Sequence, residues 1–235
     1  MLEADREIDL DCKIYDFHLT IPPSVMVPSS YTRLLFEGIP ENVNFNKGLD
    51  LGCGCGLLAL LLARRGCKKV LATDINPVAI NATNLNAKLN NVGNVVCAVE
   101  ANMFSGLPYD FDIIAFNPPS FPSLTSKKLR PNFYAGKDGR KFIDIAIKNA
   151  KHHLNPGGKF FYIQNSLSDF RKSIKMIESE GYKWKVLNSQ KTEFREEYYT
   201  QIRHLRNLKL KGYCDYIEQG GKAFQEIHIM ELQHE

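Results

Sequence analysis

The sequence predicts an α/β fold, a doubly wound, mostly parallel sheet with helices on both faces. Short β-rich apolar runs alternate with segments of helical period from Lys47 onward, which is the pattern of such sheets. The 235 residues, 44% hydrophobic and 24% charged, suffice to bury one substantial core. The longest apolar run, residues 57–63, is far shorter than the roughly 20 residues that cross a bilayer. We therefore expect one domain and no membrane span.

Seven strands and four helices are expected in the core. The strands span residues 48–51, 69–74, 94–100, 111–116, 159–164, 183–189 and 223–232. Gly66 closes the first helix, Pro77 opens the second at a position where its missing N–H costs nothing, and Ser168 is the expected N-cap of the fourth. The helices span residues 57–65, 77–89, 141–154 and 168–180.

The core domain is expected to comprise residues 47–235. Two parts of the chain do not follow its alternation of strands and helices. Residues 1–46 are expected to form an N-terminal arm packed on the core, extended because its prolines disfavour helix. Residues 195–222 form an insertion, which serves either as a lid or specificity element or as plain packing. In its first part, the helical spacing of Tyr198, Ile202 and Leu205 predicts a helix.

Composition narrows the class of protein further. The six cysteines are interpreted as free thiols of a reducing compartment. Cys53 and Cys55 form a Cys-x-Cys pair, but no second Cys or His pair stands at zinc-site spacing, so no metal is expected. The N-terminus is acidic and polar where a secretory signal would be basic and then apolar, which favours a cytoplasmic protein. A net charge of +4 does not by itself require a nucleic-acid partner.

The most informative stretch is residues 49–57, LDLGCGCGL, a strand that ends in three alternate glycines and opens an apolar helix. Glycines at this position permit a tight turn and let a cofactor approach the backbone. A dinucleotide fingerprint would need Gly or Ala where Leu57 stands, which disfavours a nicotinamide-dependent oxidoreductase. The phosphate-binding sequence G-K-[ST] is absent as well. The spacing suits a nucleoside without a pyrophosphate.

Asp74 ends the second expected strand, where its carboxylate can accept both ribose hydroxyl protons. The simpler alternative is that Asp74 only caps the helix that begins near Pro77. Because the glycine loop and this acid fall at the same edge of the sheet, we expect a ribose-bearing cofactor.

With these features the chain resembles the Rossmann-type methyltransferases that use S-adenosylmethionine, over residues 21–232. The resemblance implies that cofactor and a seven-stranded sheet whose last strand is antiparallel. It also implies that Asp74 holds the ribose and that Asn102, where the family commonly has Asp, contacts the adenine amino group. Against the methionine part it places Asp50, Gly52, Cys53, Gly54 and Gly56. The remaining cofactor residues implied are Thr32, Ile75, Met103 and Asn117.

A second motif, Asn117-Pro118-Pro119-Ser120, directly follows the fourth expected strand and predicts the catalytic residues. It resembles the signature of methyltransferases that act on amino or amide nitrogens, which usually has an aromatic residue at the position of Ser120; the adjacent Phe121 could take over that contact. The Asn117 side-chain oxygen and the Pro118 carbonyl can accept both N–H groups of the acceptor, with the prolines fixing the backbone. The alternative is a plain turn after a strand.

Two further stretches resemble the HemK-type branch, which methylates glutamine side chains in translation release factors. Residues 27–32 (VPSSYT) resemble its proline-to-threonine segment, and residues 135–140 (AGKDGR) resemble its G-x-D-G segment. Protein glutamine is therefore the first hypothesis for the methyl acceptor. The 46-residue arm is shorter than the separate helical domain that a full HemK-type enzyme carries.

An RNA base and a small amine stay open as other acceptors. The segment 127–141 is basic and could attract RNA, or it is simply a solvated loop. Its basic residues are Lys127, Lys128, Arg130, Lys137, Arg140 and Lys141. Bases could stack on Phe121, Phe133 and Tyr134. A different class of function, a catalytically silent S-adenosylmethionine-binding module, is disfavoured by the intact N-P-P sequence.

Overall fold

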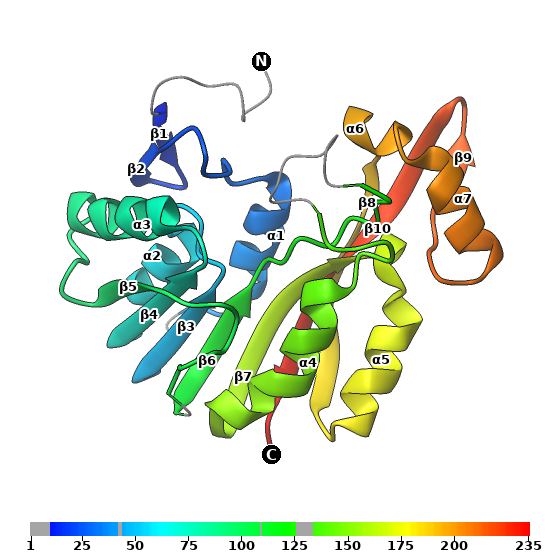
Figure 1. The fold of residues 1–235 in the computed structure, drawn as a ribbon. Coiled ribbons are helices and arrows are strands. Elements are labelled where there is room, and N and C mark those ends of the chain that lie inside the picture. The colour runs from blue at the N-terminus through cyan, green and yellow to red at the C-terminus, as the bar shows by residue number, and fades with distance from the viewer. Residues whose placement is uncertain (1–9, 42–43, 109, 126–133) are drawn as a thin grey trace. The chain divides into compact units, whose positions relative to one another are not determined.

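The computed structural model describes residues 10–41, 44–108, 110–125 and 134–235 (Figure 1). The first half contains β1 (Leu10–Ile14), β2 (Phe17–Ile21), α1 (Ser30–Gly38), β3 (Lys47–Leu51), α2 (Leu57–Arg64), β4 (Lys69–Asp74), α3 (Pro77–Leu89), β5 (Val96–Glu100) and β6 (Phe111–Phe116). The second half contains α4 (Lys141–His153), β7 (Leu154–Asn165), a 3₁₀ turn (Ser166–Ser168), α5 (Phe170–Ser179), β8 (Lys183–Glu193), α6 (Glu196–Tyr199), α7 (Ile202–Leu210), β9 (Ile217–Gln219) and β10 (Lys222–Gln233).

The predicted α/β sheet is confirmed. Its strands lie in the order β5-β4-β3-β6-β7-β10-β8, and β9 pairs with β10 in antiparallel orientation. The pairs of β3 with β4, β3 with β6, and β4 with β5 are all parallel. Three elements, β4, α3 and β6, begin and end at the residues that the sequence predicts.

The chain divides into two compact units. Unit 1 comprises Met1–Asn117, Ala150–Phe161 and Gln233–Glu235, and unit 2 comprises Pro118–Asn149 and Tyr162–Leu232. In the described residues, no helix has the length and apolar character needed to cross a membrane.

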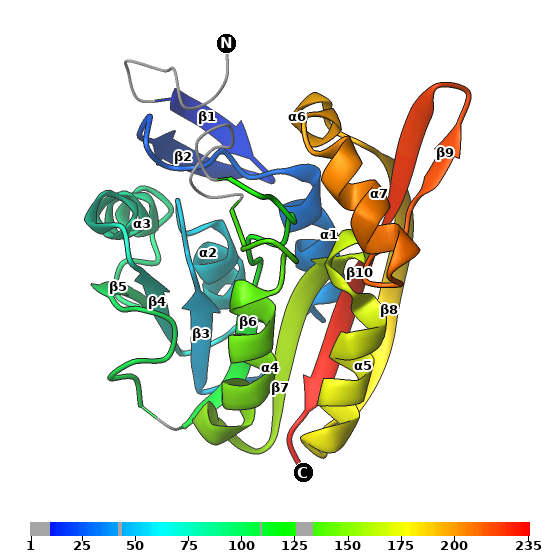
Figure 2. The same cartoon turned by 45° about the vertical axis from the view of Figure 1, so that its right-hand side comes forward.

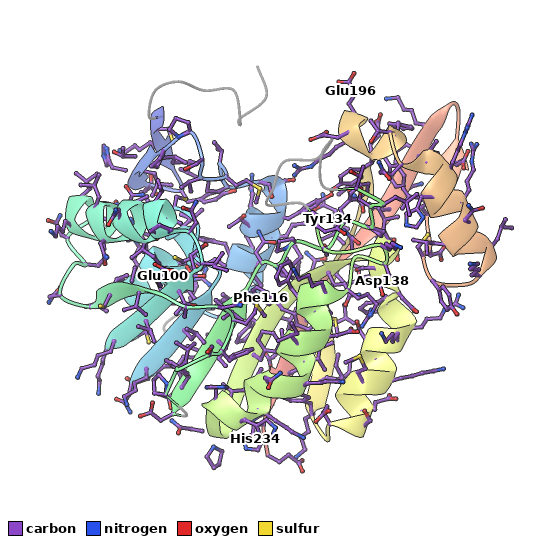
Figure 3. All side chains as sticks on the ribbon, in the orientation of Figure 1. Glu100, Phe116, Tyr134, Asp138, Glu196 and His234 are labelled. Atoms are coloured by element: carbon purple, nitrogen blue, oxygen red, sulfur yellow. The ribbon has the colours of Figure 1, made fainter. Side chains whose placement is uncertain are left out.

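The parallel strands of unit 1 place four strand ends at one edge of the sheet. Leu51 pairs with Thr73 of β4 and with Phe116 of β6, and Asp74 pairs with Glu100 of β5. Glu100 and Phe116, the last residues of β5 and β6, are labelled in Figure 3. Ligands of open α/β sheets bind at such an edge, so the motifs that follow β3, β4, β5 and β6 meet where a ligand is expected.

The N-terminal arm differs from its prediction. Its strands β1 and β2 are extended, as expected, but they pair as an antiparallel hairpin, and the helix α1 contradicts the expectation of an extended arm (Figure 2). The hairpin turns at Tyr15 and Asp16, whose φ angles of +52° and +65° lie in the left-handed region. Neither position is a glycine, the residue that usually marks such a turn in a sequence. Helix α1 begins just after Pro28, with the Ser29 hydroxyl oxygen accepting a hydrogen bond from the Tyr31 N–H. The prolines therefore fall between regular elements rather than preventing them.

Smaller corrections concern element ends. Ser168 does not cap α5; its hydroxyl donates to the Asn165 carbonyl, and Asp169 is the N-cap, with its carboxylate accepting from the Lys172 N–H. Strand β7 begins at Leu154, the last residue of the expected helix 141–154 and earlier than the expected strand start at residue 159. Gly157 and Gly158 exchange backbone hydrogen bonds with His234 in this early part of the strand.

Unit 2 has its own apolar core, and the insertion supplies much of it. The insertion forms α6, α7 and β9, where the sequence predicted one helix. The core cluster consists of Phe121, Leu167, Phe194, Tyr198, Leu205, Cys214, Tyr216 and Ala223. Packing therefore accounts for Tyr198 and Tyr216 of the insertion.

Candidate active site

The glycine loop after β3 is held by the end of β4 and by α3. The Cys53 N–H donates to the Thr73 carbonyl at 2.8 Å, and the Gly54 N–H donates to Asp74 Oδ2 at 3.0 Å. From α3, the Thr83 hydroxyl donates to the Gly54 carbonyl at 3.2 Å. Gly56 has φ +85°, and a Cβ there would lie 2.7 Å from Thr83 Cγ2. The loop can therefore approach α3 only with glycine at this position.

Asp74 is not the cap of α3, so the simpler alternative for this residue does not hold. The N-cap of α3 is Asn76, whose side-chain oxygen accepts from the Val78 N–H. The Asp74 carboxylate instead accepts from the Gly54 N–H through Oδ2 and from the Asn76 N–H through Oδ1, at 3.0 and 2.9 Å. Each carboxylate oxygen has a second lone pair, so Asp74 can accept further hydrogen bonds from a ligand.

Asp50 lies fully buried in β3, beneath the loop. Its Oδ2 accepts a hydrogen bond from the Ala59 N–H at 2.9 Å, while its Oδ1 is buried and has no hydrogen-bond partner in the described residues. Burial, together with the charge of Asp74, raises the pKa of Asp50 to about 7. Gly56, the N-cap of α2, offers no side chain, so Asp50 satisfies a first-turn N–H of that helix from the strand below.

The other predicted cofactor residues follow β4 and β5. The Ala101 N–H donates to the Asp74 carbonyl at 3.0 Å, which brings the segment containing Asn102 and Met103 alongside the end of β4. The Ile75 side chain is 65% exposed, an unusual position for a large apolar residue. The structure therefore brings the sequence-predicted residues of these two strand ends together.

Asn117 and Thr32 are in direct contact although they lie far apart in the sequence. Asn117 Nδ2 donates to the Thr32 hydroxyl oxygen at 2.9 Å, and Thr32 is buried in α1. This bond joins the proline-to-threonine segment to the Asn-Pro-Pro motif. It also orients the Asn117 amide, because the amino group is engaged and the Oδ1 oxygen stays available as an acceptor.

Ser120, in unit 2, is held by two residues. Asn165 Nδ2 donates to the Ser120 hydroxyl oxygen at 3.0 Å. Gly139 has φ +74°, and a Cβ there would lie 2.5 Å from the Ser120 carbonyl oxygen. In the same turn, Asp138, labelled in Figure 3, accepts from the Arg140 N–H. The G-x-D-G segment therefore packs directly against the backbone of the Asn-Pro-Pro-Ser motif.

Thr83 and Asn165, which hold the glycine loop and Ser120, are site residues that were not predicted from the sequence. The signal for Asn165 was present, because it is a polar residue at the carboxyl end of an apolar strand, as Asp74 is in β4 and as Asn117 is directly after β6.

Phe121 is not available to take over the aromatic contact that the family has at the position of Ser120. Phe121 is 1% exposed, and its ring stacks on Tyr198 with centroids 4.0 Å apart. Tyr134 is partly buried against the same cluster. The insertion thus buries the Phe121 ring, and part of Tyr134, because its aromatic residues pack against them.

The basic segment 127–141 is only partly described, and Arg140 does not fit its proposed role. Arg140 is 2% exposed and pairs with Asp144 at 2.6 Å. It also donates to the Asp169 carbonyl and the Ser173 hydroxyl, so it holds the start of α5 rather than facing an anionic ligand. Lys137 and Lys141 are exposed. Outside the described residues lie Lys127, Lys128, Arg130 and Phe133.

Comparison with known proteins identifies the family. Residues 29–191 match the model of the methyltransferase small domain. A Methanocaldococcus jannaschii protein, provisionally named a protein N5-glutamine methyltransferase, is 32% identical over 188 residues, covering 78% of this chain and 94% of its own. The release factor glutamine methyltransferase of Coxiella burnetii is 29% identical over 187 residues, covering 73% of this chain; the match spans 65% of that enzyme.

Among solved structures, the fold is similar to the E. cuniculi Mtq2–Trm112 complex, described as responsible for methylation of the translation termination factor eRF1. The TM-score is 0.59 at 18% identity, over 90% of this chain and 99% of the other. This likeness concerns the fold. From the family model and the M. jannaschii relative, the chain belongs to the methyltransferase small domain family and is an S-adenosylmethionine-dependent methyltransferase.

Proposed function

We propose that the protein transfers the methyl group of S-adenosylmethionine to the side-chain amide nitrogen of a protein glutamine. The observation that carries this proposal is the hydrogen bond from Asn117 Nδ2 to the Thr32 hydroxyl, which leaves Asn117 Oδ1 as an acceptor after β6. An amide nitrogen needs such acceptors, because its lone pair is delocalised until both N–H groups are held in a pyramidal arrangement. The names of the two relatives, one of them provisional, support glutamine as the acceptor.

The cofactor site that we propose lies at the carboxyl edge of β3, β4 and β5. The loop backbone from Gly52 to Gly56 and the buried Asp50 would face the methionine part, with Cys53 and Gly54 in the same turn. The Asp74 carboxylate is oriented by hydrogen bonds from two N–H groups, and it would accept hydrogen bonds from the ribose hydroxyls. The exposed Ile75 would cover one face of the adenine. Around the remaining parts of the cofactor would lie Asn102, Met103, Thr32 and Asn117.

The donor set fits this cofactor. A carboxylate supplies acceptors for a diol, a glycine turn lets the ligand approach the backbone, and an exposed aliphatic side chain offers apolar contact for a base. When bound, S-adenosylmethionine supplies a methyl group on a positively charged sulfur.

In the proposed mechanism the chain acts mainly by positioning. Asn117 Oδ1 and the Pro118 carbonyl oxygen accept the two N–H groups of the acceptor amide, which turns the nitrogen lone pair toward the methyl carbon. The same two oxygens stabilise the positive charge that develops on nitrogen during the transfer. Pro118 and Pro119 restrict the backbone that carries these groups, so less order has to be gained on binding. The nitrogen–methyl bond would form as the bond from the methyl carbon to sulfur breaks, the electron pair of that bond staying on sulfur in the S-adenosylhomocysteine that leaves. The methylated nitrogen then gives its extra proton to water.

No specific observation favours an RNA base over a protein amide. The burial of Phe121 and the engagement of Arg140 remove two of the features that suggested RNA. The ordered contact between Asn117 and Thr32 likewise supports an active enzyme over a silent binding module.

The proposal is tested by following labelled methyl groups from S-adenosylmethionine into two kinds of acceptor. We expect label in a purified translation release factor, on a glutamine side chain located by peptide mass spectrometry, and none in ribosomal RNA from the same cells. The matched control is the same release factor with that glutamine replaced by alanine, which should stay unlabelled. Label in the RNA alone, or on a different side chain, would contradict the glutamine assignment.

A further inference from the structure

Two asparagines of α3, Asn84 and Asn86, and its C-cap residue Asn90 pair with backbone in the same way. Each side-chain amide accepts from the N–H of one residue and donates to the carbonyl of that same residue, as a neighbouring strand would. The pairs are Asn84 with Ala98 at 3.0 and 3.3 Å, Asn86 with Thr20 at 2.8 and 3.1 Å, and Asn90 with His18 at 2.9 and 2.7 Å. Asn86 and Asn90 attach the β1–β2 hairpin to α3 and to its C-terminal end. Figure 2 shows the hairpin beside this helix.

Asn86 differs from the other two because it also reaches the glycine loop. Its Nδ2 donates to the Cys55 carbonyl at 2.9 Å as well as to the Thr20 carbonyl. Asn86 is fully buried, and so is its hydrogen bond to the Cys55 carbonyl, whereas its two hydrogen bonds with Thr20 are partly buried. One buried amide therefore connects the N-terminal hairpin with the loop that follows β3.

The loop is sensitive to this connection because α3 holds two consecutive carbonyls. The Gly54 carbonyl accepts from Thr83, and the Cys55 carbonyl accepts from Asn86. On the other side, the Gly54 N–H donates to Asp74. These bonds set the orientation of the peptide groups that would face a ligand. Without Asn86 the buried Cys55 carbonyl would lose this partner, which disfavours the present conformation of the loop.

We propose that Asn86 is a positioning residue of the cofactor site, through which docking of the β1–β2 hairpin and binding of S-adenosylmethionine stabilise each other. The inference rests on the proposed cofactor site. If the docked hairpin favours the loop conformation that binds the cofactor, the bound cofactor must stabilise the docked hairpin by the same free energy. A residue with only a structural role would stabilise the hairpin without this dependence on ligand.

Amide hydrogen exchange, with and without S-adenosylhomocysteine, measures this coupling directly. The Thr20 N–H donates to Asn86, so it exchanges only when the hairpin opens from α3. In the wild-type protein, saturating S-adenosylhomocysteine should slow exchange at Thr20 by about tenfold, within the usual range of coupling between sites.

The test variant is Asn86→Asp, which keeps the shape of the side chain but turns an oxygen toward the Thr20 and Cys55 carbonyls. It should weaken S-adenosylhomocysteine binding by about tenfold or more and abolish the slowing at Thr20. The matched control is Asn90→Asp, which makes the same change against the same hairpin. Asn90 Nδ2 also donates to the Asn86 backbone carbonyl but, among the described contacts, Asn90 touches no loop atom. Its affinity should stay within about threefold of the wild type, because Asn86 still connects hairpin and loop.

The outcomes separate this inference from the proposed function. Absence of binding to the wild type would contradict the cofactor site itself. Normal binding with unchanged exchange at Thr20, or with full affinity in Asn86→Asp, would overturn the role of Asn86 and leave the cofactor site intact. An equal loss of affinity in Asn90→Asp would also overturn it. If Asn86→Asp fails to fold, the comparison of Thr20 exchange in the wild-type protein with and without S-adenosylhomocysteine still tests the coupling.

Discussion

Replacing Asn117 with alanine will lower the turnover of methyl transfer by about two to three orders of magnitude, the usual effect of removing one group that stabilises transition-state charge. The variant loses the Oδ1 acceptor for the substrate N–H, while the glycine loop and Asp74 keep their hydrogen bonds. Affinity for S-adenosylhomocysteine should therefore fall by less than about tenfold, a change that initial-rate kinetics and calorimetry measure separately.

Thr32→Val is the companion variant for Asn117→Ala. It removes the hydroxyl that accepts from Asn117 Nδ2 but leaves the Asn117 side chain present. The amide is then free to rotate, and we expect a smaller loss of turnover, about tenfold. Wild-type turnover in Asn117→Ala would show that the amide of this residue takes no part in positioning the acceptor nitrogen.

Replacing Gly139 with alanine should lower turnover by about 100-fold or more, since a displacement near 1 Å at a catalytic segment has effects of this size. The new Cβ would lie 2.5 Å from the Ser120 carbonyl oxygen, a backbone atom that can move only if the Asn-Pro-Pro-Ser segment moves with it. The cofactor residues of unit 1 are untouched, so binding of S-adenosylhomocysteine should persist.

Gly136→Ala is the control that separates backbone strain from displacement. Gly136 also has a left-handed φ, +89°, but a Cβ there would meet its nearest atom, Asp138 Oδ1, at 3.6 Å. This variant carries the strain without the collision and should retain most of the turnover. Equal turnover in the two variants would contradict a specific role for Gly139 in placing Ser120.

Local patterns were sufficient to predict much of the core. Strands β4 and β6 and helix α3 match their predicted ends, because apolar runs and Pro77 mark them clearly in the sequence. The hairpin β1–β2 was missed because its turn uses Tyr15 and Asp16 in left-handed conformations, where the usual glycine signal is absent.

The motifs of the candidate site were visible in the sequence, but their contacts were not. Asn117 and Thr32 lie 85 positions apart, and Asn86 and Cys55 lie 31 apart, so no local pattern could pair them. The direction of Phe121 depended on Tyr198, a residue of the insertion whose packing is a tertiary effect. The buried state of Arg140 likewise follows from the position of α5 rather than from the basic run around it.

The most direct test of the account is calorimetric titration of the wild-type protein and of Asp74→Ala with S-adenosylhomocysteine, with circular dichroism to verify that both are folded. Asp74→Asn serves as the isosteric control, because it keeps one oxygen for the neighbouring N–H groups but lacks the second acceptor for a ribose diol. The account predicts micromolar binding to the wild type, weakened about 100-fold or more in Asp74→Ala and reduced in Asp74→Asn, in proportion to two lost charge-assisted hydrogen bonds. No binding to the wild type, or equal affinity in wild type and Asp74→Ala, would contradict the proposed cofactor site.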